Sequence, residues 1–137
     1  MVRKANAAWS GSGKEGKGTL STASKILNET PYNYVMRFAD APGTNPEELI
    51  GAAHAGCFSM KLSFVLGNSG FTADEIKTEA SVTLENGAVT QIHLEVSAKI
   101  PGITKEQFET AALDAKANCP ISKALASVPI SMNAVLA

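Results

Sequence analysis

The two cysteines are the side chains best suited to covalent chemistry. Cys57 lies in the apolar segment Ala53-His54-Ala55-Gly56-Cys57-Phe58, where a thiol can also serve as a small core side chain. Cys119 precedes Pro120, which is typical of the first helical position, so Cys119 is expected to cap a short helix. A thiol there has a lowered pKa, although a chance capping residue has the same pattern. The cysteines are far apart in the chain, so the sequence leaves open whether they meet.

Charged residues and histidines offer fewer candidates. Arg37 is one of two arginines and interrupts an otherwise apolar segment, which also fits an edge-strand charge facing water. Glu47 and Glu48 are explained by the positive end of a helix dipole. His54, on an apolar segment, is expected to be a core histidine, and His93 to lie on the polar face of a strand. No pair of histidines and cysteines has a chelating spacing, so we expect neither a metal site nor a resident cofactor.

Composition limits the classes of protein that remain. With 137 residues, 45% hydrophobic and 18% charged, the chain is expected to form one domain, residues 1–137, with a sizeable core. A net charge of -1 gives no electrostatic attraction for nucleic acid or an anionic membrane. Two cysteines are too few for a disulfide-dense secreted scaffold.

The N-terminal residues and the longest apolar segment indicate the cellular compartment in which the protein is expected. Arg3 and Lys4 are not followed by the apolar run of a secretory signal. The apolar stretch 49–66 contains Lys61 near its middle, which a membrane span would tolerate poorly. We therefore expect a cytoplasmic protein, in which thiols are kept reduced.

The elements that must position these residues follow from periodicity and capping signals. Alternating or turn-bounded segments predict strands over residues 2–9, 19–22, 31–38, 77–85, 89–100 and 130–136. The glycine-rich residues 11–18 fit a hairpin loop better than a nucleotide loop, because their spacing matches no phosphate-binding motif. Helices are predicted from Pro46 to about Gly67, after a capping box at Thr104 to about Lys116, and over about 120–127.

The order β-β-β-α-β-β-α-α-β indicates an α+β fold, with a largely antiparallel sheet packed on a long buried central helix. That helix is apolar nearly all round, from Leu49 to Leu66. A helix with no polar side needs cover on more than one flank. We therefore expect an intertwined homodimer that shares the covering.

Three segments together resemble a known family. They are Asn45-Pro46-Glu47-Glu48-Leu49, then Ala52-Ala53-His54-Ala55-Gly56-Cys57-Phe58, and Cys119-Pro120. They resemble the osmotically inducible protein C / organic hydroperoxide resistance (OsmC/Ohr) family over essentially the whole chain. Gly16-Lys17-Gly18-Thr19 and residues 32–38 are similar to the osmotically inducible branch.

The resemblance implies a cytoplasmic thiol-dependent peroxidase that reduces organic hydroperoxides, and a homodimer with its sites at the subunit interface. By position, Cys57 is the peroxidatic cysteine and Cys119 the resolving one, joined in a Cys57–Cys119 disulfide that an external dithiol reductant resets. Glu47 matches the acid that holds the active-site arginine. The hydroperoxide resistance branch places this arginine in the glycine-rich turn, where this chain has only Lys17; Arg37 matches the osmotically inducible branch.

Physical chemistry is consistent with these roles. A guanidinium beside a thiol favours the thiolate and stabilises the alkoxide that leaves. Apolar neighbours such as Phe58 and Met60 suit an alkyl or lipid peroxide. A continuous helix would separate Glu47 from Cys57 by about 15 Å along its axis. We therefore expect the partner chain to supply Arg37, Glu47 or both to each Cys57.

Two other functions fit the same pattern of elements. A central helix wrapped by antiparallel strands is also typical of hot-dog-like acyl-thioester hydrolases, which need neither cysteine. A non-catalytic lipid-binding dimer is the other alternative. Iodoacetamide would inactivate a thiol peroxidase and spare both alternatives.

Overall fold

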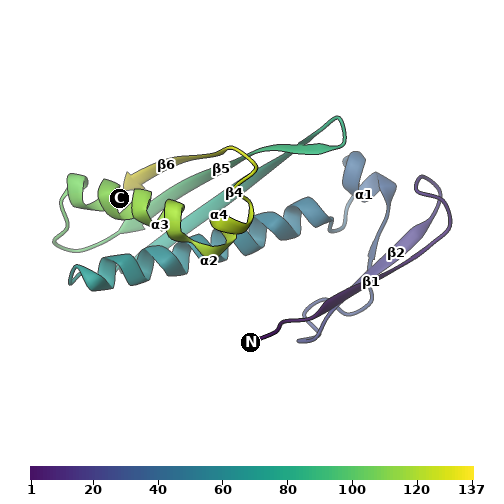
Figure 1. Ribbon diagram of the computed structural model, residues 1–137, viewed down its shortest axis with the longest axis horizontal. Coiled ribbons are helices and arrows are strands. Elements are labelled where there is room, and N and C mark those ends of the chain that lie inside the picture. Colours follow the sequence, from purple (N-terminus) through teal and green to yellow (C-terminus); the bar gives the residue numbers. More distant parts are fainter. The chain divides into compact units, whose positions relative to one another are not determined.

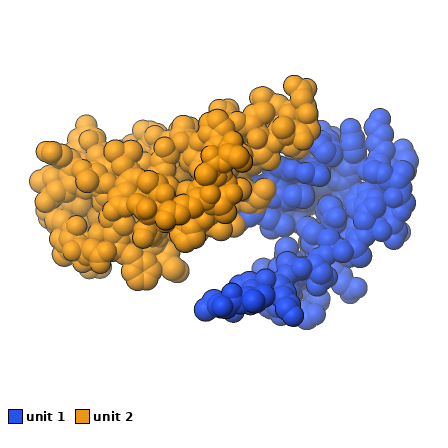
Figure 2. Space-filling view, viewed as in Figure 1, with its two compact units in different colours: residues 1–49 blue, residues 50–137 orange.

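The computed structural model describes all 137 residues, which form two compact units, residues 1–49 and residues 50–137 (Figure 2). Ten elements follow one another along the chain (Figure 1). They are β1 (Ala5–Ser10), β2 (Lys17–Thr22), β3 (Thr30–Tyr32), α1 (Tyr34–Phe38), α2 (Pro46–Asn68), β4 (Glu75–Glu85), β5 (Ala88–Lys99), α3 (Lys105–Asn118), α4 (Pro120–Ala124) and β6 (Ile130–Leu136).

In the first unit, β1, β2 and β3 form an antiparallel sheet in that order. Gly18 pairs with Trp9 on one side and with Tyr32 on the other, and the two rings lie 5.3 Å apart between centroids. A Cβ at Gly18 would overlap both rings. The glycine-rich segment is therefore a hairpin, as predicted, and the structure adds that Gly18 lets two aromatic side chains meet.

The prediction of a strand over residues 31–38 is wrong. β3 ends at Tyr32, and the short helix α1 follows. Asn33 caps this helix, because its side-chain oxygen accepts a hydrogen bond from the Met36 N–H at 3.0 Å. The rings of Tyr34 and Phe38, one helical turn apart, pack with their centroids 4.8 Å apart. The alternating large apolar residues thus continue into a helical turn instead of a strand, and Arg37 lies on helix α1.

Helix α2 begins where the sequence predicts. Asn45 accepts a hydrogen bond from the Glu48 N–H at 2.8 Å, Pro46 is the first helical residue, and Glu47 and Glu48 occupy the first turn. The helix ends at Asn68, one residue beyond the predicted end.

One face of α2 is a core face and another is exposed. Phe58 and Leu62 are completely buried in the hydrophobic core with side chains of β5, whereas Met60 and Phe64 are each 65% exposed. The helix is long and apolar enough to cross a membrane by length and composition, but this packing makes it the core helix of its unit. Cover on the exposed face stays a prediction.

The sheet of the second unit has the order β4-β5-β6. β4 and β5 form the predicted antiparallel hairpin at Asn86-Gly87, whose φ values of 51° and 76° match a two-residue hairpin turn. β6, in contrast, pairs parallel to β5, because α3 and α4 carry the chain back across the sheet (Figure 1). The predicted inward residues of β5 are buried, namely Ile92, Leu94, Val96 and Ala98, together with Ile100 just beyond it.

Helices α3 and α4 meet at Cys119. The predicted capping box at Thr104 is present, with its reciprocal hydrogen bonds to Gln107 at 3.0 and 3.1 Å. Phe108 and Ala115 on α3 join the same core as α2 and β5. α3 continues two residues past the predicted end, to Asn118, and α4 ends at Ala124, before the predicted residue 127. Cys119 is the only residue between them.

Candidate active site

The structure brings the two cysteines into contact. The sulfur atoms of Cys57 on α2 and Cys119 at the start of α4 lie 2.9 Å apart, although 62 positions separate them in the chain. Both are free thiols. Cys57 is partly exposed, whereas Cys119 is 0% exposed. One thiol is therefore open to small molecules and the other is reached through the first.

Hydrogen bonds on both sides hold the backbone of Cys119. Its N–H donates to the carbonyl of Ala115 at 2.9 Å, which ends α3, and its carbonyl accepts from the N–H of Lys123 at 3.1 Å, which begins α4. Pro120 cannot continue α3 with a backbone donor, so the chain changes direction there. This change of direction turns the Cys119 side chain toward α2.

The two sulfurs differ in acidity. Burial raises the pKa of Cys57, and the contact with Cys119 adds to this effect, while the Ile121 amide and Lys61 oppose it. Burial alone would also raise the pKa of Cys119. Hydrogen bonding to Cys57, to the amide and hydroxyl of Ser122 and to the Ile121 amide outweighs burial, so the pKa of Cys119 is lowered. Within one chain, Cys119 is therefore the more acidic of the two thiols.

A buried hydrogen-bonded pair, His54 and Ser122, lies on α2 and α4 close in sequence to the two cysteines. The Nε2 atom of His54 is 2.8 Å from the hydroxyl oxygen of Ser122, and both residues are buried. His54 lies one turn before Cys57 on α2, and Ser122 follows Cys119 by three residues on α4. His54 is thus the core histidine that the sequence predicts. Sequence reasoning did not single out Ser122. Cys119 occupies the N-cap position of α4, as predicted, but its side chain makes no capping hydrogen bond.

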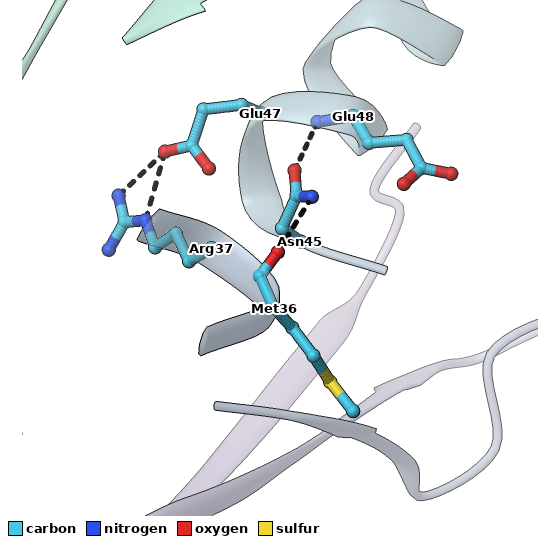
Figure 3. A network of polar contacts seen from close by, with 5 residues as sticks. All are labelled: Met36, Arg37, Asn45, Glu47 and Glu48. Carbon is cyan, nitrogen blue, oxygen red and sulfur yellow. Dashed lines mark hydrogen bonds and ion pairs between the residues drawn. The ribbon is translucent and has the colours of Figure 1, made fainter. Parts of the chain in front are cut away.

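In the first unit, Arg37 and Glu47 form an ion pair (Figure 3). The Oε1 atom of Glu47 accepts hydrogen bonds from Nε of Arg37 at 3.0 Å and from its Nη2 at 2.8 Å. The Glu47 side chain is 9% exposed and that of Arg37 is 40% exposed. Asn45, at the start of α2, is hydrogen-bonded to α1, because its side-chain amide donates to the carbonyl of Met36 at 3.1 Å. The carboxylate is therefore a fixed support for a guanidinium that is still accessible.

Arg37 borders an open pocket of about 500 Å³ within the first unit. Four of its eight lining residues are aromatic and two are cations: Trp9, Gly13, Lys14, Tyr32, Asn33, Tyr34, Arg37 and Phe38. Arg37 lies over the ring of Phe38, 5.1 Å from its centroid. An apolar ligand with a polar or anionic end fits this combination of rings and guanidinium.

Comparison with known proteins bears on both parts of the site. Residues 39–133 match the model of the family described as OsmC-like protein, and this range includes Glu47, Cys57 and Cys119. The chain belongs to the OsmC-like protein family. It is 49% identical over 127 residues to the protein named Peroxiredoxin OsmC of Escherichia coli K12, covering 90% of this chain and 89% of the relative.

Relatives from the hydroperoxide resistance branch are more distant. The Staphylococcus saprophyticus protein named Organic hydroperoxide resistance protein-like 1 is 32% identical over 91 residues, covering 63% of this chain and 64% of that protein. The family member therefore lies on the OsmC side, as the sequence predicts.

Solved structures agree in fold. The OsmC-like protein from Mycoplasma pneumoniae superimposes with a TM-score of 0.77 at 12% identity, covering 99% of this chain and 97% of that one. The organic hydroperoxide resistance protein OsmC from Legionella pneumophila gives a TM-score of 0.71 at 21% identity, covering 98% and 96%. These likenesses support the α+β fold with a long central helix.

Proposed function

We propose that this protein is a thiol-dependent peroxidase of the cytoplasm that reduces organic hydroperoxides to alcohols. The observation that carries the proposal is the 2.9 Å contact between the Cys57 and Cys119 sulfurs. The protein named Peroxiredoxin OsmC, at 49% identity, supports the same chemistry.

The reaction begins at Cys57, because it is the thiol that solvent reaches. The Cys57 thiolate attacks one oxygen of the hydroperoxide, the O–O bond breaks, and the alkoxide leaves and takes up a proton to become an alcohol. Cys57 is then a sulfenic acid. Cys119 attacks its sulfur, the S–O bond breaks, and a disulfide and water result. Two thiols have then been oxidised and one hydroperoxide reduced.

A dithiol reductant closes the cycle. Its first thiolate attacks the disulfide, and its second thiol displaces the protein from the mixed disulfide. The reductant leaves as a disulfide, and Cys57 and Cys119 return to thiols. The protein itself needs no resident cofactor for these steps.

Cys57 needs a cation that its own surroundings supply only weakly. Its pKa is raised by burial, and Lys61, one turn further along α2, only partly offsets this. Arg37 is the cation suited to the task, since Glu47 orients it and leaves it accessible. Its guanidinium would favour the Cys57 thiolate and stabilise the departing alkoxide.

The active arrangement is a homodimer in which Arg37 and Glu47 of one chain serve Cys57 of the other. Because α2 is continuous from Pro46 to Asn68, Glu47 and Cys57 are separated by about 15 Å along its axis. An arginine held by Glu47 is therefore far from the Cys57 of the same helix. The exposed Met60 and Phe64 on α2 provide an apolar face that a second chain would cover.

The aromatic pocket beside Arg37 favours an alkyl or aryl hydroperoxide over hydrogen peroxide. Its rings can hold the apolar tail while the guanidinium receives the peroxide oxygen. Phe58, which the sequence suggested as an apolar neighbour of the substrate, does not contribute, because it is completely buried in the core. Met60, the other neighbour that the sequence suggested, is exposed in the single chain and lies on the face that the second chain would cover.

The test is to count free thiols before and after one equivalent of cumene hydroperoxide. We expect both thiols to be lost and a dithiol to restore both. Cys57→Ser is the control and should leave Cys119 unreacted. If the wild-type protein keeps both thiols free, the peroxidase proposal fails. Hydrolysis of an acyl thioester that survives iodoacetamide would then favour the acyl-thioester hydrolase.

A further inference from the structure

A second group of polar side chains, which the peroxidase cycle does not use, lies on the outer face of the sheet in the second unit. His93 and Glu95 point outward from β5, with 42% and 51% of their side chains exposed, while the residues that alternate with them are buried in the core. Ser131 and Asn133 are their register partners on β6. All four side chains therefore share one face of two hydrogen-bonded strands, on the polar side where the sequence places His93.

Hydrogen bonds join these four side chains into one series. The Nδ1 atom of His93 is 2.7 Å from the hydroxyl oxygen of Ser131, and its Nε2 atom is 3.3 Å from Oε2 of Glu95. The other carboxylate oxygen, Oε1, accepts a hydrogen bond from the Asn133 amide at 2.6 Å. A serine hydroxyl thus contacts an imidazole whose second nitrogen is held by an acid, which is the arrangement that activates nucleophilic serines.

The carboxylate fixes the direction of these hydrogen bonds. An ionised carboxylate can only accept, so the His93 nitrogen that faces Glu95 carries the proton of the neutral ring. The Nδ1 atom is then an acceptor, and the Ser131 hydroxyl donates to it. The proton that Ser131 must lose when its oxygen attacks an electrophile is therefore already directed at a base.

Ser81 provides a comparison within the same sheet. It is the register partner of His93 on the other neighbouring strand, β4, so both serines flank the imidazole on the same face. Both are exposed. The hydrogen bond of His93 nevertheless goes to Ser131. The structure therefore distinguishes one serine that is paired with a base from an equally accessible one that is not.

An open pocket of about 560 Å³ adjoins this series at Asn133, where β6 lies beside α3. Its lining includes Phe108 and Val135, of which Val135 is 50% exposed. Ser131 precedes Asn133 by two positions on the same face of β6, which is a distance of about 7 Å along a strand. A short apolar chain held in this pocket can therefore present an attached carbonyl group to the Ser131 oxygen.

We propose that Ser131 is a nucleophilic site that takes up a short acyl group from an activated ester or thioester, with His93 as its general base and Glu95 as the residue that positions the imidazole. The Ser131 oxygen attacks the acyl carbon, its proton passes to Nδ1 of His93, and a new C–O bond forms. The bond from the acyl carbon to the leaving oxygen or sulfur breaks. The leaving group departs with the electron pair and takes the proton from His93, so nothing is oxidised or reduced.

The direct test incubates the full-length protein with p-nitrophenyl butyrate and locates the butyryl group by mass spectrometry of its peptides. Peptide mapping separates Ser131 from the cysteines and lysines, which also react with such esters. A general base accelerates a reaction about 100- to 10,000-fold, so we expect Ser131 to be acylated at least about 100-fold faster than Ser81. Equal rates of acylation at the two serines overturn the inference.

Substitution of His93 tests the base. His93→Gln keeps a hydrogen-bonding side chain beside Ser131 but cannot take up its proton, so acylation of Ser131 should fall to the rate of Ser81. Ser81→Ala is the matched control and should leave the acylation of Ser131 unchanged. If Ser131 is acylated as fast in His93→Gln as in the wild type, the inference is overturned.

Glu95→Gln tests the positioning residue with little change in shape. Exposed ion pairs contribute little, so acylation of Ser131 should slow only about two- to fivefold. Nitrogen NMR of the His93 ring gives a readout that a merely structural role would not change: the proton should move from Nε2 toward Nδ1, because a Gln amide can donate where the carboxylate only accepts. An unchanged rate together with an unchanged tautomer overturns the proposed series.

Peroxide reduction is the control for folding, because the series contains neither Cys57 nor Cys119. His93→Gln should reduce cumene hydroperoxide at the wild-type rate. If this variant loses both reactions, the comparison of Ser131 with Ser81 in the wild-type protein decides. A wild-type protein that fails to reduce the peroxide would contradict the peroxidase proposal and leave the acylation result standing.

Discussion

Replacing Glu47 by Gln tests whether the ion pair in the first unit has a catalytic purpose. The change keeps an oxygen that can accept hydrogen bonds from Arg37 but removes the negative charge. Two charge-assisted hydrogen bonds, at 3.0 and 2.8 Å, are weakened together. Hydrogen bonds to charged groups contribute about 1.5–3 kcal/mol each. Because the Arg37 side chain is 40% exposed and partly solvated, we expect a net loss of about 1–2 kcal/mol in the positioning of the guanidinium.

That loss should appear in the kcat/KM for cumene hydroperoxide, measured by coupling to a dithiol reductant, as a decrease of about 5- to 30-fold. Glu48→Gln is the matched control, since Glu48 is the next residue on α2, is exposed and makes no ion pair. Arg37→Met should cost more, about 100- to 1000-fold, because it removes the donor to the departing oxygen itself. The double variant of Arg37 and Glu47 should be no worse than Arg37→Met, because Glu47 acts through Arg37.

The pH dependence gives a second readout. Without Arg37, the pKa of Cys57 stays raised by burial, so its thiolate forms only at higher pH. The activity of Arg37→Met should therefore keep rising through the alkaline range, whereas the wild-type activity levels off earlier. Wild-type kcat/KM in Glu47→Gln, or an Arg37→Met profile that levels off where the wild type does, would refute the reasoning.

Three further predictions follow from other contacts. Cys119→Ser should complete about one turnover, after which mass spectrometry should find Cys57 over-oxidised to the sulfinic acid, because no resolving thiol remains; a variant that keeps turning over contradicts the assigned role. Leu62→Ala removes a completely buried side chain and should lower the free energy of unfolding, measured with denaturant, by about 2–5 kcal/mol; a loss under 1 kcal/mol would argue against the packed face of α2. Phe64→Glu should lower the mass measured by light scattering, whereas Leu113→Glu, at an equally exposed apolar position on α3, should not; equal masses for both would remove the proposed dimer face.

Local signals in the sequence predicted most element boundaries. The Asn45-Pro46 start of α2, the capping box at Thr104 and the Asn86-Gly87 hairpin each depend on residues within one turn of each other, so they can be read without tertiary information. The prediction of a strand over residues 31–38 was wrong because another local signal, the helix cap at Asn33, was overlooked. Asn33 is a cap as well as a loop residue, and the local hydrogen bond that it makes decided against the strand.

The residues of the candidate site were proposed from the sequence one by one, whereas their contacts could not be predicted from it. The parallel pairing of β6 with β5 depends on how α3 and α4 cross the sheet, which no local pattern specifies. The contact of Cys57 with Cys119 likewise depends on the packing of α3 and α4 beside α2. Resemblance to a family, rather than spacing, paired Cys57 with Cys119 and Arg37 with Glu47 in advance, and Ser122 lay outside the motifs that carry this resemblance.

The contact between the two sulfurs has a consequence for engineering. Because Cys57 and Cys119 already touch in the reduced protein, closing the disulfide requires no helix to unwind and no loop to travel. Closing the disulfide therefore makes no demand on flexibility, unlike catalysis in enzymes whose lids or local unfolding limit the rate. Heat-resistant versions of this enzyme should therefore be obtainable by rigidifying the scaffold around α2 and α3 without a penalty in turnover.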